Sequence, residues 1–259
     1  MKEWVKRSIE ITNAPGYLDK LYEVYPVIQE AEREISEDVK SRLKEIYNAG
    51  DDVELIKELL KLPKFPINDP YVAFLRKREV FIEFNPKTVQ RIAKRIRLMG
   101  YDAMMESIEE PKVASKQIGT LFKKWLYNVG YPVLSVEDFE NYTNTAFLQG
   151  NDAQLKDFAN TVLGCDLEKG PDLLAKLGRK YVIGEAKFLT DYGGAQNANF
   201  EDALRLLRGK KGEAIRIAVL DGVVWIEDST KMYRTVCQLE EVALTALLLK
   251  DFLDRLRED

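Results

Sequence analysis

Apolar residues recur at helical spacing through the first 62 residues of the chain. In the ranges 17–34 and 36–49 they are interspersed with charges, and Asp51 and Asp52 stand where they can cap a third helix. The apolar positions of that third helix share one face: Val53, Ile56, Leu59 and Leu60. The pattern predicts a helical N-terminal region, followed by a proline-marked connection at 63–70.

A basic helix follows this connection. Residues 76–84 suggest a short strand or an irregular piece, and Asn85-Pro86 predicts the start of a helix that Gly100 ends. The helix carries basic side chains that form either a solvated face or a phosphate-contacting face: Lys87, Arg91, Lys94, Arg95 and Arg97. The stretch 88–108 also suggests a helix-turn-helix, although it lacks a clear turn pattern.

From residue 112 onward, helical and alternating patterns succeed one another. The expected elements are a helix at 112–128, a strand at 131–136, a polar loop at 137–150, a helix at 151–163, a hairpin at 170–189, a helix around 200–208, strands at 214–220 and 223–227, and a long helix at 238–255. A hairpin and a strand–helix–strand unit together give a mixed sheet. We therefore expect an α/β fold with a mixed central sheet flanked by helices, and a right-handed crossover after residue 180.

The composition restricts the chemistry that this chain can perform. It has no histidine, which excludes Ser-His-Asp and Cys-His nucleophilic schemes and His-ligated zinc. The net charge is −4, so binding to nucleic acid would need a local basic cleft rather than bulk charge. Cys165 and Cys237 lack metal-ligand spacing and are expected to be free thiols. No secretory or membrane-spanning pattern is present, so we expect a cytoplasmic protein, and abundant Lys and Glu suggest a thermophile.

The hairpin at 170–189 carries the most distinctive chemistry. Pro171-Asp172 opens its first strand, and the second strand alternates so that Ile183, Glu185 and Lys187 share one face. Two charges on one face of an apolar strand are costly to bury without partners, and a metal ion and a phosphate would be suitable partners. The alternative from these residues alone is a surface hairpin with a salt bridge.

These residues resemble the PD-(D/E)xK nuclease superfamily, and in particular type II restriction endonucleases. The resemblance covers about residues 112–225 and rests on Pro171, Asp172, Glu185 and Lys187 with the flanking helices and strands. Two other D/E-x-K matches, at 38–40 and 110–112, lie in a helical pattern and across a proline. Only Glu185 and Lys187 lie in an apolar strand that follows a Pro-Asp pair.

The resemblance implies a Mg²⁺-dependent, sequence-specific cleavage of double-stranded DNA that leaves 5′-phosphate ends. Asp172 and Glu185 would be metal ligands together with the Ala186 carbonyl, and Lys187 would orient or deprotonate the attacking water. Many members add an acidic residue from the helix before the first strand. Here that helix offers Gln117 in place of a carboxylate, so either a second metal site is lacking or Gln117 is a ligand of the metal or of its water shell. The other acidic candidates are Glu137 and Asp138.

DNA recognition is expected directly downstream of the lysine. Amide side chains in the range 190–199 can read base edges, and the candidates are Thr190, Asp191, Tyr192, Gln196, Asn197 and Asn199. An ordinary glycine-rich turn is the alternative interpretation of this stretch. The loop at 137–151 is a second candidate, and Arg91 and Lys94 are candidates for DNA contact on the basic helix. A palindromic target would imply a homodimer, and a restriction system implies a cognate DNA methyltransferase.

The predicted organisation is a helical region at 1–110 that serves DNA binding or dimerisation, and a catalytic core at 111–259 with its C-terminal helix. The alternatives are a DNA repair nuclease or Holliday junction resolvase of the same fold, and a non-enzymatic DNA-binding protein. A RecB-like enzyme often carries Q-x-x-x-Y after the lysine, whereas here Gln196 is followed by Phe200.

Overall fold

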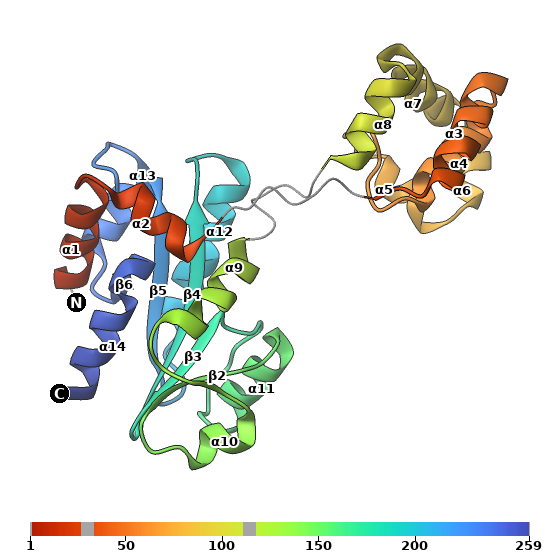
Figure 1. Cartoon of the computed structure of the whole chain (residues 1–259). Coiled ribbons are helices and arrows are strands. Elements are labelled where there is room, and N and C mark those ends of the chain that lie inside the picture. The colour runs from red at the N-terminus through yellow and green to blue at the C-terminus, as the bar shows by residue number, and fades with distance from the viewer. Residues whose placement is uncertain (1, 27–33, 111–117, 259) are drawn as a thin grey trace. The chain divides into compact units, whose positions relative to one another are not determined.

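The chain forms two compact units in the computed structural model, which describes residues 2–26, 34–110 and 118–258. One unit combines Met1–Val27 with Ala114–Asp259, and the other is Ile28–Val113 (Figure 1). The helical region therefore divides differently from the expected boundary at residue 110. Its first two helices belong with the α/β unit because their apolar residues, Trp4 and Val24 among them, lie in the core of that unit.

A mixed sheet organises the α/β unit. Its strands are β1 (Val133–Leu134), β2 (Thr145–Leu148), β3 (Leu173–Leu177), β4 (Lys180–Leu189), β5 (Ile215–Gly222) and β6 (Val242–Leu244). They lie side by side in the order in which they occur along the chain. β3 pairs antiparallel with both β2 and β4, while the β1–β2, β4–β5 and β5–β6 pairs are parallel. The expected mixed α/β architecture is confirmed as a restriction-endonuclease-like fold.

The β3–β4 hairpin is tight at one end and staggered at the other. Leu177 pairs with Lys180 across a turn in which Gly178 has a φ of 61°, a left-handed conformation that favours glycine. At the open end Leu173 pairs with Gly184, whereas β4 continues to Leu189 alongside β5. Residues 185–189 of β4 therefore extend beyond the beginning of β3, and on that side they have no β3 residue as a pairing partner.

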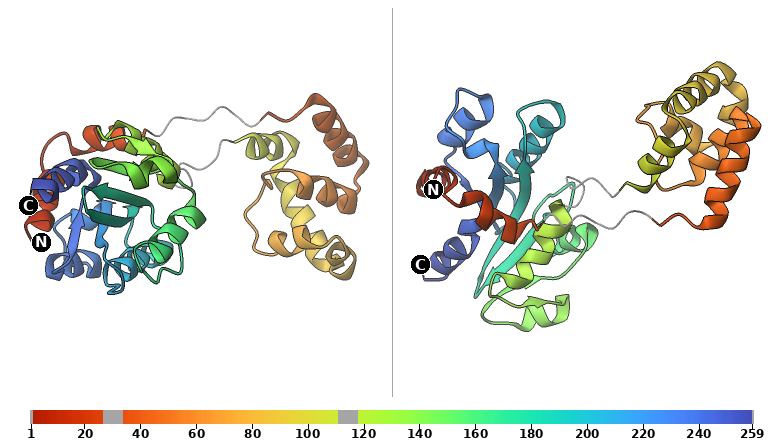
Figure 2. Two further views of the ribbon diagram at one scale, coloured as in Figure 1. Left: turned by 90° about the horizontal axis from the view of Figure 1, so that it is seen from below. Right: turned by 45° about the horizontal axis from the view of Figure 1, so that its top comes forward.

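Helices cover both faces of this sheet (Figures 1 and 2). The α-helices of the unit are α1 (Lys2–Thr12), α2 (Tyr17–Val24), α9 (Ile118–Trp125), α10 (Val136–Asn141), α11 (Asp152–Thr161), α12 (Gly194–Leu207), α13 (Lys231–Gln238) and α14 (Leu249–Glu258). The 3₁₀ segments are η2 (Leu126–Asn128), η3 (Val223–Trp225) and η4 (Ala246–Leu248). α12 connects β4 to its parallel neighbour β5, as a crossover helix does.

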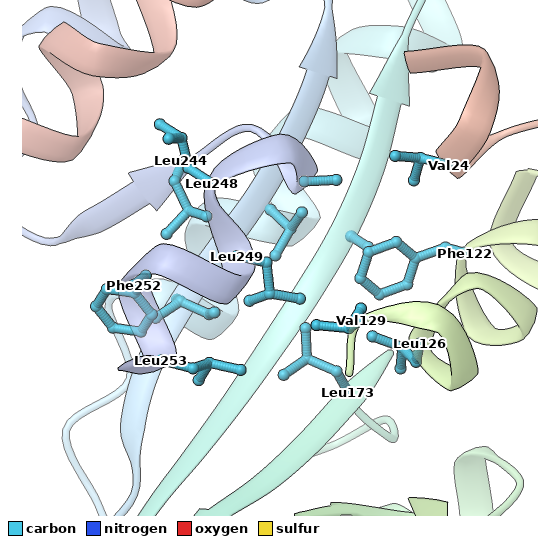
Figure 3. Close-up of a cluster of buried hydrophobic side chains, with 14 of the residues drawn as sticks. Val24, Phe122, Leu126, Val129, Leu173, Leu244, Leu248, Leu249, Phe252 and Leu253 are labelled. Atoms are coloured by element: carbon cyan, nitrogen blue, oxygen red, sulfur yellow. The ribbon is translucent and has the colours of Figure 1, made fainter. Parts of the chain in front are cut away.

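Two apolar layers enclose the strands. On one face, residues of α2, α9 and α14 meet β3, β4 and β6 in the cluster of Figure 3, which includes Val24, Phe122, Leu173, Leu244 and Phe252. On the other face α12 and α13 pack over β5 and the end of β4, where the Trp225 indole is fully buried. Side chains of β4 alternate between these layers, so a polar residue in the middle of the strand, 182–186, is buried whichever way it faces.

The first and last helices of the unit lie side by side (Figure 2). Arg7 of α1 is 2.7 Å from Asp251 of α14, and Arg255 of α14 is 2.7 Å from Glu3 of α1. These exposed ion pairs add little stability by themselves, so the contact depends mainly on Trp4, whose ring meets Phe252 edge-on. None of the helices in the described ranges is long and apolar enough to cross a membrane.

Several expected elements were wrong. The polar stretch 137–150 contains most of α10 and the fully buried β2. The expected strand at 223–227 is not formed, and its first three residues are the 3₁₀ segment η3. The stretch 238–255 contains β6, η4 and most of α14 instead of one helix. The expected strand at 131–136 is only Val133–Leu134. Short elements such as β2 and β6 carry too few residues for their periodicity to show in the sequence, and pairing with neighbouring strands decides them.

The second unit consists of helices around a core of its own. They are α3 (Glu37–Ala49), α4 (Asp52–Lys61), α5 (Val72–Lys77), α6 (Val80–Phe84), α7 (Pro86–Met99) and α8 (Tyr101–Glu109). Residues 76–84, expected as a strand or irregular piece, are mostly helical. α7 and α8 are separated by Gly100 alone, so the suggested helix-turn-helix, which needs a turn of three to four residues, is also wrong. Leu59, Ile92 and Met104 are fully buried in this core.

Candidate functional site

Asp172 stands immediately before β3, at the open end of the hairpin. Its backbone N–H donates to the Gly184 carbonyl at 2.9 Å, and its Oδ2 accepts a hydrogen bond of 2.9 Å from the Ala186 N–H. Both contacts cross to β4, so the pairing of the two strands fixes the direction of the carboxylate. About a fifth of the side chain is exposed, which makes the group partly accessible from outside.

Glu185 lies on β4 where the strand passes beyond β3, and its side chain is only 1 % exposed. Its Oε1 is 2.6 Å from Lys187 Nζ, while Oε2 has no hydrogen-bond donor among the described residues. A buried carboxylate with an unsatisfied oxygen is costly unless a cation compensates it. Glu185 therefore has the chemistry of a group built to receive positive charge.

Lys187 lies two residues further along β4, on the same face as Glu185. Besides its 2.6 Å contact with Glu185, its Nζ is 3.9 Å from Asp172 Oδ2. Its side chain is 19 % exposed, so the ammonium group lies at the boundary between the carboxylates and solvent. The structure thus brings together Asp172, Glu185 and Lys187, the three side chains expected to form the site.

The pKa of the Asp172 carboxyl is raised above its ordinary value. Burial is the main cause and the neighbouring Glu185 charge is the second, while the positive charge of Lys187 and the Ala186 N–H oppose them. Two neighbouring carboxylates bind a cation more readily than one does alone, because the cation compensates both charges. The repulsion between these carboxylates means that protons and metal ions compete for Asp172.

The site offers a third oxygen on the same side of β4. The Ala186 N–H points to Asp172, and the N–H and C=O of one strand residue point to the same side, so the Ala186 carbonyl also faces the Asp172 edge. The pairing of β3 with β4 begins at Leu173 and Gly184, so no residue of β3 pairs with β4 beside Ala186. Two carboxylates and a carbonyl are oxygen donors that suit Mg²⁺, which keeps several waters as further ligands. Across the described parts of the chain, no three Asp, Glu, Cys or His side chains form a candidate metal cluster.

The additional site residues expected from the sequence do not join this group. Gln117 lies outside the described residues. Asp138 is exposed in α10, where its Oδ2 accepts a hydrogen bond from Ser135 at 2.8 Å. Glu137 lies in the same short helix. That helix follows β1, which β2 separates from β3 in the sheet.

The stretch after Lys187 forms the loop from β4 into α12 and the first turns of that helix. Thr190, Asp191 and Asn197 are exposed, and Asn199 is half-buried. Gln196 donates to Thr190 Oγ1 at 3.2 Å, and the Tyr192 hydroxyl donates to the Val223 carbonyl at 3.0 Å. The residue that precedes α12 is Gly193, so no asparagine side chain caps the helix. Phe200, at the position of the tyrosine in a Q-x-x-x-Y element, is buried in the core.

Two further candidates lie on α7 of the second unit, and they differ in their surroundings. Both Arg91 and Arg95 pair with the buried Asp69 carboxylate, and the Arg91 guanidinium also lies over the Tyr71 ring. Lys94 is exposed and has no ion-pair partner within the described ranges. The Arg91 charge is therefore already paired with Asp69 within the unit, whereas the Lys94 charge faces solvent.

Lys169, which the sequence did not indicate, also reaches Glu185, and Asp202 lies next to Lys169. Lys169 Nζ lies 2.5 Å from Glu185 Oε1 and 3.8 Å from Asp202 of α12. Lys169 stands three residues before Asp172, and this proximity in the chain is the one sequence signal that could have indicated it. No sequence signal indicates Asp202, because it lies far from Lys169 in the chain and α12 brings the two residues together.

A mixed sheet with an acidic hairpin end, an adjacent lysine and a crossover helix defines the restriction-endonuclease-like nucleases. Neither curated proteins nor solved structures gave a significant match to the chain. The family model of the Tsp45I type II restriction enzyme matches residues 2–256. The chain belongs to the Tsp45I type II restriction enzyme family, and it is a site-specific endodeoxyribonuclease that acts on DNA.

Proposed function

We propose that Asp172, Glu185 and Lys187 are the catalytic residues of this restriction endonuclease, and that it hydrolyses both strands of DNA with Mg²⁺ to leave 5′-phosphate and 3′-hydroxyl ends. The observation that carries the proposal is the buried Glu185 carboxylate, which faces Lys187 and has an oxygen without a donor among the described residues. A surface salt bridge would leave such a group in solvent.

The chain's own residues divide the work. Asp172, Glu185 and the Ala186 carbonyl would hold Mg²⁺, which when bound supplies Lewis-acid polarisation of the scissile phosphate. Lys187 is held between both carboxylates and solvent, so its ammonium group can orient the attacking water and stabilise the negative charge that develops on the phosphate. Burial of Glu185 strengthens each of these electrostatic contacts because little water screens them.

DNA contact is proposed at the exposed end of the hairpin. The candidates follow β4 directly: Thr190, Asp191, Tyr192, Gln196, Asn197 and Asn199. The exposed members of the group would meet base edges or phosphates. A cavity of about 850 Å³, lined by Lys123 and residues 149–152 among others, includes the end of the second expected recognition stretch. On the second unit, Lys94 is the stronger candidate for phosphate contact than Arg91.

We also propose that the enzyme is a homodimer and that it acts together with a DNA methyltransferase. A homodimer would place one catalytic site on each strand of a symmetric target, and its mass is measurable by sedimentation. A cognate DNA methyltransferase would protect the host's own sites. The family is one of restriction endonucleases, so its membership supports these proposals over repair, junction resolution or binding without cleavage.

Cleavage assays with matched variants test the site. Asp172→Asn, Glu185→Gln and Lys187→Met should each lower the rate of plasmid cleavage by about 100-fold or more while the protein stays folded. Asp38→Asn is the control, because Asp38 belongs to a D/E-x-K match on α3, in the second unit. Wild-type protein with Mg²⁺ should give discrete bands and EDTA should abolish them; end-labelling after phosphatase treatment identifies the 5′-phosphate. Wild-type cleavage by the Asp172→Asn protein would refute the assignment.

A further inference from the structure

The Glu185 carboxylate faces two ammonium groups, although its motif contains only one lysine. Lys187 comes from the same strand face, and Lys169 comes from the loop before Asp172. Their Nζ atoms lie 2.6 Å and 2.5 Å from the same oxygen, Glu185 Oε1. Lys187 is shared between Glu185 and Asp172, so Lys169 supplies Glu185 with a second ammonium group that the motif does not provide.

The loop that carries Lys169 is held in place by α11. The Leu167 N–H donates to Asn160 Oδ1 at 2.8 Å, and Lys156 Nζ donates to the Glu168 carbonyl at 2.9 Å. Next to Lys169, Gly170 packs so closely that a Cβ there would lie 1.9 Å from the Asp152 carbonyl oxygen. The backbone of Lys169 is thus fixed, and the reach of its side chain to Glu185 follows from the fold.

A divalent cation bound to the Glu185 carboxylate and the Lys169 ammonium group at Oε1 would lie close together, whichever carboxylate oxygen the cation takes. Metal–oxygen bonds of Mg²⁺ or Ca²⁺ are about 2.0–2.6 Å long, which is the distance that the ammonium nitrogen already takes, and the two positive charges repel each other. Lys187 keeps a second carboxylate, Asp172, 3.9 Å away. Lys169 is the more solvent-exposed of the two lysines, with a side chain 53 % exposed against 19 % for Lys187, so it moves at lower cost.

The structure also provides a place to which Lys169 can move. A cavity of about 510 Å³ adjoins its side chain and is lined by Asp202, Asp166 and Arg205 among others. Asp202 already lies 3.8 Å from Lys169 Nζ, and its side chain is 35 % exposed. An ammonium group that leaves Glu185 therefore meets a second carboxylate after a short displacement and is not left without a counter-charge.

We propose that Lys169 is a positioning residue that stands in for the metal: it neutralises Glu185 in the metal-free enzyme and is displaced toward Asp202 when a divalent cation binds. This inference rests on the proposed metal site. Because Lys169 competes with the metal for Glu185, its removal strengthens metal binding and destabilises the metal-free protein. Removal of Asp202 has the opposite effect on metal binding, because the displaced ammonium group loses its partner.

Isothermal titration of the full-length protein with Mn²⁺, without DNA, tests the proposal. Lys169→Met should bind Mn²⁺ about tenfold more tightly than wild type, which corresponds to about 1.4 kcal/mol. Lys169→Arg, which keeps the charge, should bind no more tightly than wild type. Lys211→Met is the matched control, since Lys211 is paired with Asp166 on the surface and has no contact with Glu185. Metal-free Lys169→Met should also melt at a lower temperature and regain stability with Mn²⁺.

A second pair of variants keeps the test decisive if Lys169→Met folds poorly. Asp202→Asn should weaken Mn²⁺ binding severalfold in the wild-type background and have no effect when combined with Lys169→Met or Lys169→Gln. Unchanged or weaker binding by Lys169→Met and Lys169→Gln, or an Asp202→Asn effect that persists without Lys169, overturns the proposal. Glu185→Gln distinguishes a failure of the Lys169 proposal from a failure of the proposed metal site. If this variant binds Mn²⁺ as well as wild type does, the metal site itself is wrong.

Discussion

Asp221 shows what a buried carboxylate does when the fold supplies its partners. It is fully buried, and its oxygens accept hydrogen bonds from the Tyr25 hydroxyl at 2.8 Å, the Thr245 hydroxyl at 2.5 Å and the Ala246 N–H at 3.2 Å. Glu185 is equally buried but has cations instead of hydroxyl donors. The comparison separates two kinds of buried acid: Asp221 joins β5 to α2 and η4, and Glu185 is left to bind charge.

The pH dependence of stability tests this account of Asp221. Burial raises the pKa of its carboxyl to about 6, although the hydrogen bonds from Thr245, Tyr25 and Ala246 oppose the rise. Between the ordinary value of 3.8 and about 6, the folded protein holds a proton that the unfolded chain has lost. This contribution to stability is full below pH 3.8 and is lost as the pH rises through about 6.

Asp221→Asn removes this titration. Relative to the variant, the free energy of unfolding of the wild type should fall by up to about 3 kcal/mol between pH 4 and pH 7. Urea unfolding followed by circular dichroism at both pH values measures the difference, and comparison with the variant cancels the titration of all other groups. Parallel curves for the two proteins would show that the Asp221 pKa is not raised.

At the scale of elements, the site depends on the stagger between β3 and β4 and on the loop that leads into β3. β4 presents Glu185 and Lys187 only because it continues past Leu173, and Asp172 reaches the same point because its loop is packed against the start of α11. Gly170 permits that packing, since only a residue without a side chain fits against the Asp152 backbone.

Gly170→Ala should therefore disturb the site and the fold together. Its Cβ would meet the Asp152 carbonyl oxygen at 1.9 Å, and displacement of the loop should cost roughly 1–3 kcal/mol of stability and most of the cleavage activity. Gly119→Ala in α9 is the matched control: its Cβ meets nothing within 4 Å, and the change should add about 0.5–1 kcal/mol of helix stability. Thermal melting and a cleavage assay measure both variants. Equal behaviour of the two would contradict the packing argument.

At the scale of the whole molecule, the chain leaves the α/β unit after α2 and returns to it before α9. The helices of 34–110 bury their own apolar residues around Leu59, Ile92 and Met104, so this unit has the core that independent folding requires. The α/β unit in turn includes both chain ends, with α1 against α14. The helical region is thus an insertion into the nuclease fold and not a leader before it.

The isolated fragment 34–110 should fold by itself. We expect a helical circular dichroism spectrum and a cooperative thermal transition from this fragment. Ile92→Asp should abolish the transition because Ile92 is fully buried, whereas Leu98→Asp on the same helix should leave it nearly unchanged because Leu98 is 78 % exposed. A fragment without cooperative melting would show that the unit needs the rest of the chain.

The sequence by itself determined the strand pair and its chemistry. Alternation along 181–189, the Pro171-Asp172 pair and the absence of histidine led to the nuclease resemblance, because period-two patterning and residue type are local properties. It also indicated the mixed sheet and the helical character of much of 1–110. These features do not depend on which distant segments meet.

Only the tertiary structure decided what depends on contacts between distant segments. Residues 2–26 pack on the sheet because their apolar faces complete its core, although their pattern is like that of the neighbouring helices. β2 and β6 have too few residues for a strand pattern to be recognised in the sequence, and they form by pairing with longer strands. A packed loop brings Lys169 to Glu185, and a crossover helix brings Asp202 to Lys169; neither contact follows from a local sequence pattern.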